Sequence, residues 1–146
     1  MQKTFTLDEL HKISHEIVAF ITKQKNNLSS TVLCLHGDLG AGKTTLVQHI
    51  AKHLGVSQHM QSPTFTILKN YPCQENNPWK NLIHIDAYRI NHDSELQRLS
   101  WDNYVQNPNN LICIEWSENV PGLIPESAIH IYLNHADQNN RTITLK

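Results

Sequence analysis

The sequence predicts a single three-layer α/β domain over residues 1–146, with a mostly parallel core sheet and added antiparallel strands. Three observations favour this class. A chain of 146 residues has the length of one domain. Short apolar runs typical of buried strands alternate with segments of helical spacing. One glycine-rich turn joins such a strand to such a helix.

The first half of the chain contains two predicted helices and one predicted strand. Thr6–Glu9 has the order of a capping box, and apolar residues recur at helical spacing after it, so we expect the chain to begin with an amphipathic helix. Residues 31–35 form an apolar run rich in strand formers, which predicts a buried strand. Residues 44–54 predict the next helix, and Gly55 stands where a helix C-terminal glycine is common.

The second half reads as strands with one further helix. After the break at Ser62-Pro63 we expect strands over residues 64–68, 82–87, 111–116, 128–133 and 142–145. Residues 71–80 predict a loop or hairpin tip, and residues 93–105 predict a helix. The final two strands flank a polar turn, which suggests an antiparallel addition to the sheet.

Charge and cysteine content exclude several classes of function. The chain has 12 Lys and Arg against 13 Asp and Glu, so it lacks the basic field that steers strong nucleic-acid binding. No apolar run approaches the roughly 20 residues of a membrane span, and the N-terminus does not resemble a secretory signal. Three widely spaced cysteines support neither a disulfide framework nor a zinc knuckle. We expect buried thiols at Cys34 and Cys113 and a cytoplasmic location.

The strongest motif is the glycine-rich loop Gly37–Thr44, which matches G-x-x-x-x-G-K-[ST] between a predicted strand and a predicted helix. Backbone N–H groups of such a loop surround phosphate oxygens, and the helix directs its positive end at the anion. Lys43 is placed to reach β- and γ-phosphate oxygens, and the Thr44 hydroxyl is a ligand for Mg²⁺. The candidate nucleotide-binding residues are Asp38, Leu39, Gly40, Ala41, Gly42, Lys43, Thr44 and Thr45.

Two acidic residues stand at the ends of predicted strands. His84, Asp86 and Tyr88 alternate with apolar residues, and the apolar run 111–114 ends in Glu115. Ligands of open α/β sheets collect at the carboxyl ends of strands. We therefore expect one of these acids to ligate Mg²⁺, although sequence physics alone leaves open which one. A surface acid at a strand end is the simpler interpretation of each, and alternation places Trp116 on the face opposite Glu115.

Two weaker signals have structural explanations. Thr64, in Ser62-Pro63-Thr64-Phe65, could sense a γ-phosphate as a switch residue, but taken alone the segment is better explained as a plain strand entry. His11 and His15, and likewise His49 and His53, are spaced four apart on predicted helices. Such pairs can bind metal, but without further ligands we interpret them as solvated helix faces.

Four motifs in order, GDLGAGKT, SPTF, HIDAYR and EWSE, resemble the TsaE (YjeE) family of small bacterial P-loop ATPases that serve threonylcarbamoyladenosine modification of tRNA. The resemblance extends over nearly the whole chain. It implies a P-loop NTPase-like sheet, ATP or ADP as ligand, and Mg²⁺ held by Thr44 and Glu115. It also implies catalytic roles for Asp86, Lys43 and Thr64, and a nucleotide contact for Arg141.

The resemblance further implies weak ATP hydrolysis that serves two partners, a TsaB-like and a TsaD-like protein. The TsaD-like partner transfers threonylcarbamoyl to adenosine 37 of tRNA, so the ATPase itself needs no strong grip on nucleic acid and no membrane. Two alternatives stay open. A small P-loop kinase would need additional arginines on a lid, and this chain has only Arg89, Arg98 and Arg141. An ATP-sensing module without significant turnover would need Lys43 but not Asp86.

Overall fold

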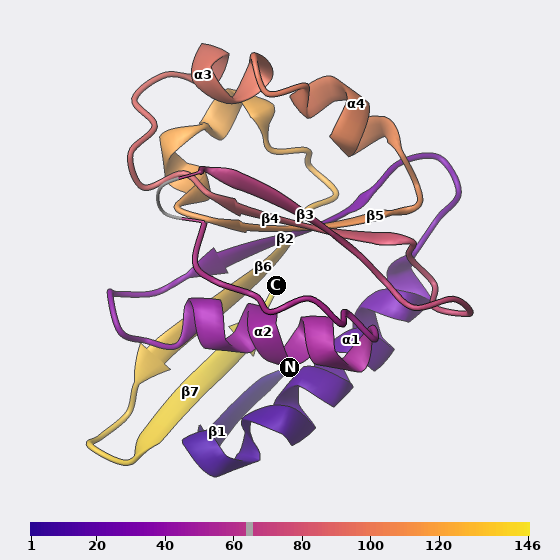
Figure 1. The fold of residues 1–146 in the computed structure, drawn as a ribbon. Coiled ribbons are helices and arrows are strands. Elements are labelled where there is room, and N and C mark those ends of the chain that lie inside the picture. Colours follow the sequence, from indigo (N-terminus) through magenta and orange to yellow (C-terminus); the bar gives the residue numbers. More distant parts are fainter. Residues whose placement is uncertain (64–65) are drawn as a thin grey trace.

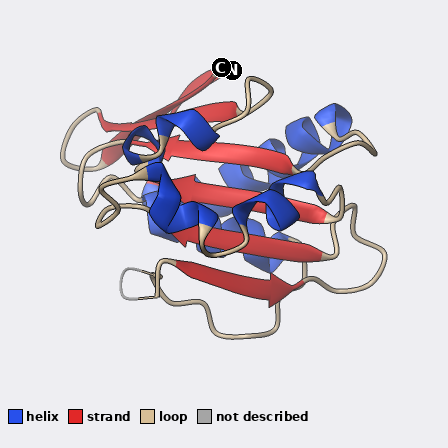
Figure 2. Ribbon diagram, turned by 90° about the horizontal axis from the view of Figure 1, so that it is seen from above, coloured by secondary structure: helices blue, strands red, loops and turns tan. Residues whose placement is uncertain are grey.

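The computed structural model describes residues 1–63 and 66–146, which build a seven-stranded sheet of order β1-β7-β6-β2-β5-β4-β3. The strands are β1 (Gln2–Thr6), β2 (Thr31–His36), β3 (Leu68–Pro72), β4 (Asn81–Asp86), β5 (Asn110–Glu115), β6 (Ile129–His135) and β7 (Asn140–Leu145). The four central strands β6, β2, β5 and β4 run parallel, whereas β3, β7 and β1 are antiparallel additions at the two sides (Figure 2). The expected mixed α/β sheet with a mostly parallel middle is confirmed.

Helices cover both faces of this sheet. The α-helices are α1 (Leu10–Gln24), α2 (Lys43–His53), α3 (Asp93–Gln97) and α4 (Trp101–Gln106), and the 3-10 turns are η1 (Leu7–Glu9), η2 (Ser117–Asn119) and η3 (Pro121–Leu123). Figure 1 shows α1 and α2 against one face, and α3 and α4 over the other. The molecule therefore has the three layers that the sequence predicts.

Two buried clusters, one on each face of the sheet, form the core. Leu33 and Leu35 of β2 belong to the cluster beneath α1 and α2, whereas Val32 and Cys34 belong to the cluster beneath α3 and α4. Because successive side chains of a strand point to opposite faces, a strand buried on both sides needs a continuous apolar run. Cys34 and Cys113 are fully buried, as predicted.

The expectation that the chain begins with a helix is wrong, because β1 precedes η1 and α1. β1 pairs with β7 at the edge of the sheet, where Phe5 lies opposite Arg141, and Phe5 is its only buried residue. A strand with one buried side chain lacks an apolar alternation that sequence reasoning could detect. The Glu9 carboxylate does accept the backbone N–H of Thr6 at 2.8 Å, as a capping box requires.

The strand expected over residues 64–68 is also displaced. Thr66 and Ile67 lie in a turn, and β3 begins only at Leu68, so it takes in the start of the predicted loop 71–80. Ile67 has φ of 66°, a left-handed conformation that interrupts an extended strand. Thr64, which is the predicted switch residue, and Phe65 both lie outside the described residues.

The helix predicted over residues 93–105 is divided into α3 and α4. Ser100 adopts a left-handed conformation with φ of 67°, and this conformation separates α3 from α4. The break lets Trp101 turn into the core, where only 2% of its surface is exposed. The apolar spacing of residues 93–105 could not reveal the break at Ser100, because the break goes with the burial of Trp101, which depends on the rest of the fold.

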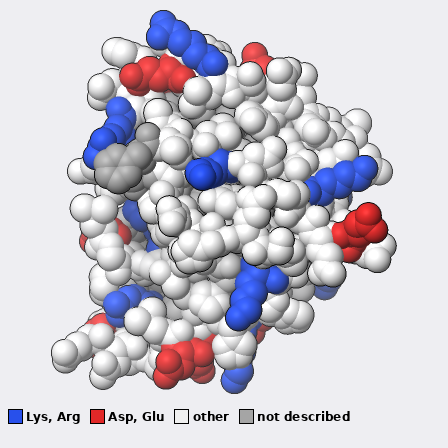
Figure 3. All heavy atoms as spheres, in the orientation of Figure 1, with Lys and Arg blue, Asp and Glu red and all other residues white. Residues whose placement is uncertain are grey.

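The surface carries no large region of one charge on the face shown in Figure 3. Lys and Arg are interspersed with Asp and Glu there, and uncharged atoms separate them. Within residues 1–63 and 66–146, none of the helices combines the length and the apolar character that crossing a membrane demands.

Candidate functional site

The glycine-rich loop connects β2 to α2 at the carboxyl edge of the parallel strands. Gly42 precedes the first turn of α2 and has φ of 104°, which residues with a Cβ rarely adopt. Gly37 also needs the absence of a Cβ, because that atom would collide with the backbone carbonyl of Leu133 in β6. The loop therefore turns directly over the end of the sheet and presents the N-terminus of α2 beside it.

Lys43 is the first residue of α2, and its side chain is held by two neighbours. Its Nζ donates a hydrogen bond of 2.6 Å to the backbone oxygen of Gly37 and lies 4.1 Å from the centre of the Trp116 ring. Only 6% of the residue is exposed. A buried ammonium needs such partners, and an anion entering the loop would offer a stronger one.

Glu115 connects three elements through its carboxylate. The Thr44 hydroxyl donates to its Oε1 and Oε2, at 3.2 and 3.0 Å, and His84 Nε2 lies 2.7 Å from Oε2. His84 is fully buried and Glu115 is 3% exposed. Since a carboxylate accepts rather than donates, His84 carries a proton on Nε2 and fixes the orientation of Glu115 toward Thr44.

Asp86 lies beside Glu115, because the two residues are register partners on β4 and β5. The backbone N–H of Tyr88 donates to Asp86 Oδ1 at 3.0 Å, which holds the carboxylate in position. Asp86 is 7% exposed. The parallel pairing therefore explains why two acids 29 positions apart in the sequence meet at one point.

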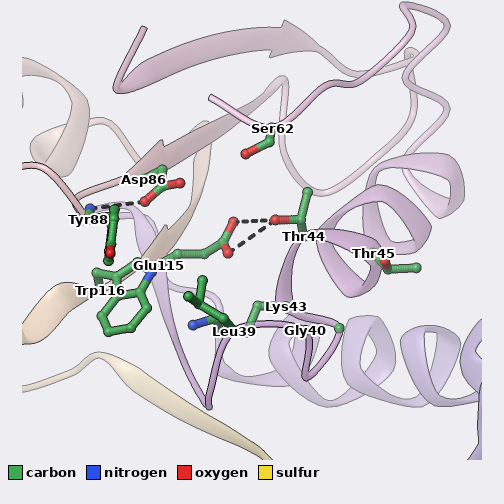
Figure 4. Close-up of a pocket in the computed structure, with 11 residues that line it drawn as sticks. Leu39, Gly40, Lys43, Thr44, Thr45, Ser62, Asp86, Tyr88, Glu115 and Trp116 are labelled. Atoms are coloured by element: carbon green, nitrogen blue, oxygen red, sulfur yellow. Dashed lines mark hydrogen bonds between the residues drawn. The ribbon is translucent and has the colours of Figure 1, made fainter. Parts of the chain in front are cut away.

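These groups surround one cavity of about 340 Å³, which we call the loop pocket. It is lined by Leu39, Gly40, Gly42, Lys43, Thr44, Thr45, Ser62, Asp86, Tyr88, Glu115 and Trp116. Figure 4 shows Glu115 extending to Thr44, with Asp86, Tyr88 and Trp116 beside it. The structure thus brings together eight of the predicted site residues, from the loop, α2, β4 and β5.

Three other predicted site residues are not among those that line the loop pocket. The backbone oxygen of Asp38 accepts the Ala41 N–H at 3.0 Å, and Ala41 is buried, so this backbone contact shapes the loop. Arg141 stands on β7 opposite His135, at the same edge of the sheet as the loop. Its Nη1 donates to the backbone oxygen of Asn140 at 3.2 Å, while its buried Nε has no hydrogen-bond partner among the described residues.

The candidate site predicted from the sequence leaves out four residues of this region: His84, Tyr88, Trp116 and Ser62. The alternation in β4 was a signal for His84, because an unpaired imidazole on a buried strand is costly. Trp116 was expected on the face opposite Glu115, but it lines the same pocket. Its φ of 62° ends the extended conformation after Glu115, so strand alternation no longer applies.

A histidine pair adjoins the loop on the side of β6. His36 Nε2 lies 2.8 Å from His130 Nδ1, and the His36 ring also stacks on Tyr132. Burial, and then the neighbouring His130, lower the pKa of His36, and Lys43 acts in the same direction while Glu118 opposes it. The residue before the glycine-rich loop is therefore held in its neutral form at neutral pH.

Replacing His84 with alanine is expected to destabilise the protein by about 3 kcal/mol, since it leaves the buried Glu115 carboxylate with the Thr44 hydroxyl as its remaining donor and opens a cavity. Urea unfolding of the ligand-free protein measures this loss. His135→Ala is the control, because His135 is exposed at the end of β6. A loss for His84→Ala no larger than that of the control would contradict the positioning role.

The fold and the loop pocket define a class: an α/β protein whose glycine-rich loop and two acidic strand ends meet at the carboxyl edge of a parallel sheet. Such an edge is where open α/β sheets bind their ligands. Residues 5–143 match the family described as "Threonylcarbamoyl adenosine biosynthesis protein TsaE". The chain belongs to the TsaE family.

Individual relatives agree with this assignment. The chain is 36% identical to the tRNA threonylcarbamoyladenosine biosynthesis protein TsaE of Rickettsia typhi, over 84% of this chain and 81% of that protein. It is 38% identical to the protein of the same name from Bacillus subtilis, over 77% of this chain and 67% of the relative. The crystal structure of YdiB from Bacillus subtilis superposes with a TM-score of 0.69 at 27% identity, covering 99% of this chain and 84% of that one.

Proposed function

We propose that this chain is a Mg²⁺-dependent ATP-binding and ATP-hydrolysing protein with a P-loop NTPase-like fold. In this proposal it acts in the cytoplasm and supports the threonylcarbamoyl transfer that modifies adenosine 37 of tRNA. One observation carries the proposal: the Thr44 hydroxyl and the Glu115 carboxylate meet at 3.0 Å in the loop pocket, beside Asp86 and Lys43. A hydroxyl, two carboxylates and an ammonium at a glycine-rich loop are the groups that phosphoryl chemistry uses.

The residues present fit ATP with its metal ion. Lys43 would exchange its contact with the Gly37 carbonyl for phosphate oxygens, while the first turn of α2 supplies backbone N–H donors. Thr44 and Glu115 offer the oxygen ligands that Mg²⁺ prefers. Bound Mg²⁺ would neutralise charge that develops on the phosphates.

The remaining groups would orient the attack on the γ-phosphate. Asp86 accepts the proton of a water molecule and directs its oxygen, and the Tyr88 backbone N–H keeps that carboxylate in place. His84 keeps Glu115 directed toward Thr44. Thr64 as a switch residue and Arg141 as a nucleotide contact complete the proposed set, with Arg141 reaching the nucleotide from β7.

The partners in this proposal are the TsaB-like and TsaD-like proteins of the transfer complex. The relatives from Rickettsia typhi and Bacillus subtilis are named as tRNA threonylcarbamoyladenosine biosynthesis proteins, and we propose that this biosynthesis needs several proteins acting together. The near balance of 12 Lys and Arg against 13 Asp and Glu favours a protein that acts on partner proteins over one that holds tRNA strongly.

Phosphate release from ATP, measured with the protein alone and then with both partners and tRNA, tests the proposal. We expect slow release alone and clear stimulation by the complete mixture. Transfer of the phosphoryl group to an acceptor other than water would instead show a kinase. ATP binding without release in either mixture would show a sensing module.

Replacing Glu115 with glutamine is expected to raise the Mg²⁺ concentration for half-maximal ATP hydrolysis by about tenfold or more, because a neutral amide binds a hard cation less well. A magnesium titration of the hydrolysis rate measures it. Glu118→Gln is the matched control, since Glu118 is half exposed and does not line the loop pocket. An unaltered titration for Glu115→Gln would assign the metal to another ligand.

A further inference from the structure

The strand that carries Asp86 continues directly into a tight turn. The Ile90 N–H donates to the Ala87 backbone oxygen at 3.0 Å, and this hydrogen bond closes the turn over residues 87–90. The Tyr88 N–H, from within the same turn, donates to Asp86 Oδ1 at 3.0 Å (Figure 4). The direction of that N–H, and with it the position of the carboxylate, therefore depends on the conformation of the turn.

A side chain from the neighbouring strand end contacts this turn. Asn119 is the last residue of η2, the short 3-10 turn that follows β5 and Trp116. Its Nδ2 lies 2.8 Å from the Ala87 backbone oxygen and 3.4 Å from the Tyr88 backbone oxygen. Because a carbonyl oxygen only accepts hydrogen bonds, the amide nitrogen of Asn119 faces the turn and donates to it.

This contact adds to the backbone pairing of the sheet and is separate from it. A hydrogen bond of 2.9 Å from the Ala87 N–H to the Glu115 backbone oxygen continues the parallel pairing of β4 and β5 one residue past Asp86. The Asn119 amide contacts the carbonyl groups that come next, those of Ala87 and Tyr88. Removing the amide would therefore release the turn while the register of the two strands stays in place.

Asn119 is also set apart from the groups that would react. It is half-buried, and it is not among the residues that line the loop pocket. A side chain outside the pocket does not contact a nucleotide bound within it. An effect of Asn119 on hydrolysis would therefore pass through the turn and the carboxylate that the turn holds.

We propose that Asn119 is a positioning residue for Asp86: its amide fixes the turn over residues 87–90, and the turn directs the Tyr88 N–H at the carboxylate. This inference rests on the proposed function, in which Asp86 directs the attacking water. A group that accepts a proton from water must be held closely, since a displacement of about 1 Å can cost about 100-fold in rate. Asn119 thus connects the strand end that carries Glu115 to the strand end that carries Asp86.

Single-turnover phosphate release and calorimetric titration with ATP test this role in Asn119→Ala and Asn119→Asp. The first variant removes the amide, and the second keeps its shape but replaces both N–H donors with a carboxylate. We expect hydrolysis at saturating ATP to fall about 10- to 100-fold in both variants, and the ATP affinity of Asn119→Ala to stay within about threefold of the wild type. Asn103→Ala is the matched control, because Asn103 is exposed on α4 and does not line the loop pocket. It should leave both quantities unchanged.

A double-mutant cycle with Asp86→Asn separates positioning from a general weakening of the fold. If Asn119 acts through Asp86, Asn119→Ala should change the residual hydrolysis of Asp86→Asn by less than about threefold. Circular dichroism and thermal melting confirm that each variant is folded. An equal loss in the Asp86→Asn and wild-type backgrounds, or wild-type hydrolysis by Asn119→Ala and Asn119→Asp, would overturn the proposal.

Solvent exchange of the Tyr88 amide, measured by NMR on the nucleotide-free protein, tests the same contact without ATP. We expect exchange at least about tenfold faster in Asn119→Ala than in the wild type, because the hydrogen bond to Asp86 opens once the turn is released. The Ala87 amide, which donates to Glu115, is the internal reference and should exchange at the wild-type rate. A wild type that does not hydrolyse ATP would refute the proposed function, whereas wild-type hydrolysis with unchanged Tyr88 exchange in Asn119→Ala would overturn the positioning role alone.

Discussion

Asp86→Asn is expected to lower the rate of ATP hydrolysis by about 100- to 10,000-fold, the range that loss of a general base produces. The affinity for ATP should stay close to that of the wild type, because the amide keeps the shape of the carboxylate and its contact with the Tyr88 backbone N–H. Phosphate release measures the first quantity, and calorimetric titration with ATP measures the second.

The matched control for this variant is Asp102→Asn, since Asp102 is exposed on α4, on the other face of the sheet from α2. It should leave both rate and affinity unchanged. Equal hydrolysis by Asp86→Asn and the wild type would remove the proton-accepting role and favour a module that senses ATP. A large loss of affinity would instead indicate that Asp86 acts in binding.

Lys43→Ala is expected to weaken ATP binding by about 10- to 100-fold and to abolish measurable turnover, since it removes a charge-assisted donor to phosphate. Calorimetric titration with ATP measures the affinity. Lys52→Ala is the control on the same helix, because Lys52 is exposed near the C-terminus of α2 and does not line the loop pocket.

Lys43 also contacts Gly37 and Trp116, so the thermal stability of the ligand-free variant must be compared with that of the wild type. A stable variant that binds ATP with wild-type affinity would remove the glycine-rich loop from the proposed function. A stable variant with weak binding identifies the ammonium itself as the group that holds the phosphates.

The parts of the fold that sequence predicted best are those whose signals are local. The continuous apolar run of β2 reflects burial on both faces, and the glycines of the loop reflect backbone conformations that other residues avoid. In contrast, β1 and the break at Ser100 depend on partners distant in sequence. β1 exists because β7 pairs with it, and Ser100 turns the chain so that Trp101 reaches the core.

The candidate site divides in the same way. The spacing of the glycine-rich loop identified Lys43 and Thr44, but only the parallel register of β4 and β5 shows that Asp86 and Glu115 are neighbours. The position of Trp116 could not be predicted from strand alternation, because the strand ends one residue earlier.

The open sheet leaves β1 and β3 as its outer strands, and each carries features that discourage chain-to-chain association. Lys3 is exposed on β1, while β3 exposes Lys69 and ends at Pro72, which lacks an N–H group to donate. Outward lysines and proline are the means by which open sheets resist edge-to-edge aggregation. We therefore expect these three side chains, which lie outside both the core and the loop pocket, to protect the two edges of the sheet from association.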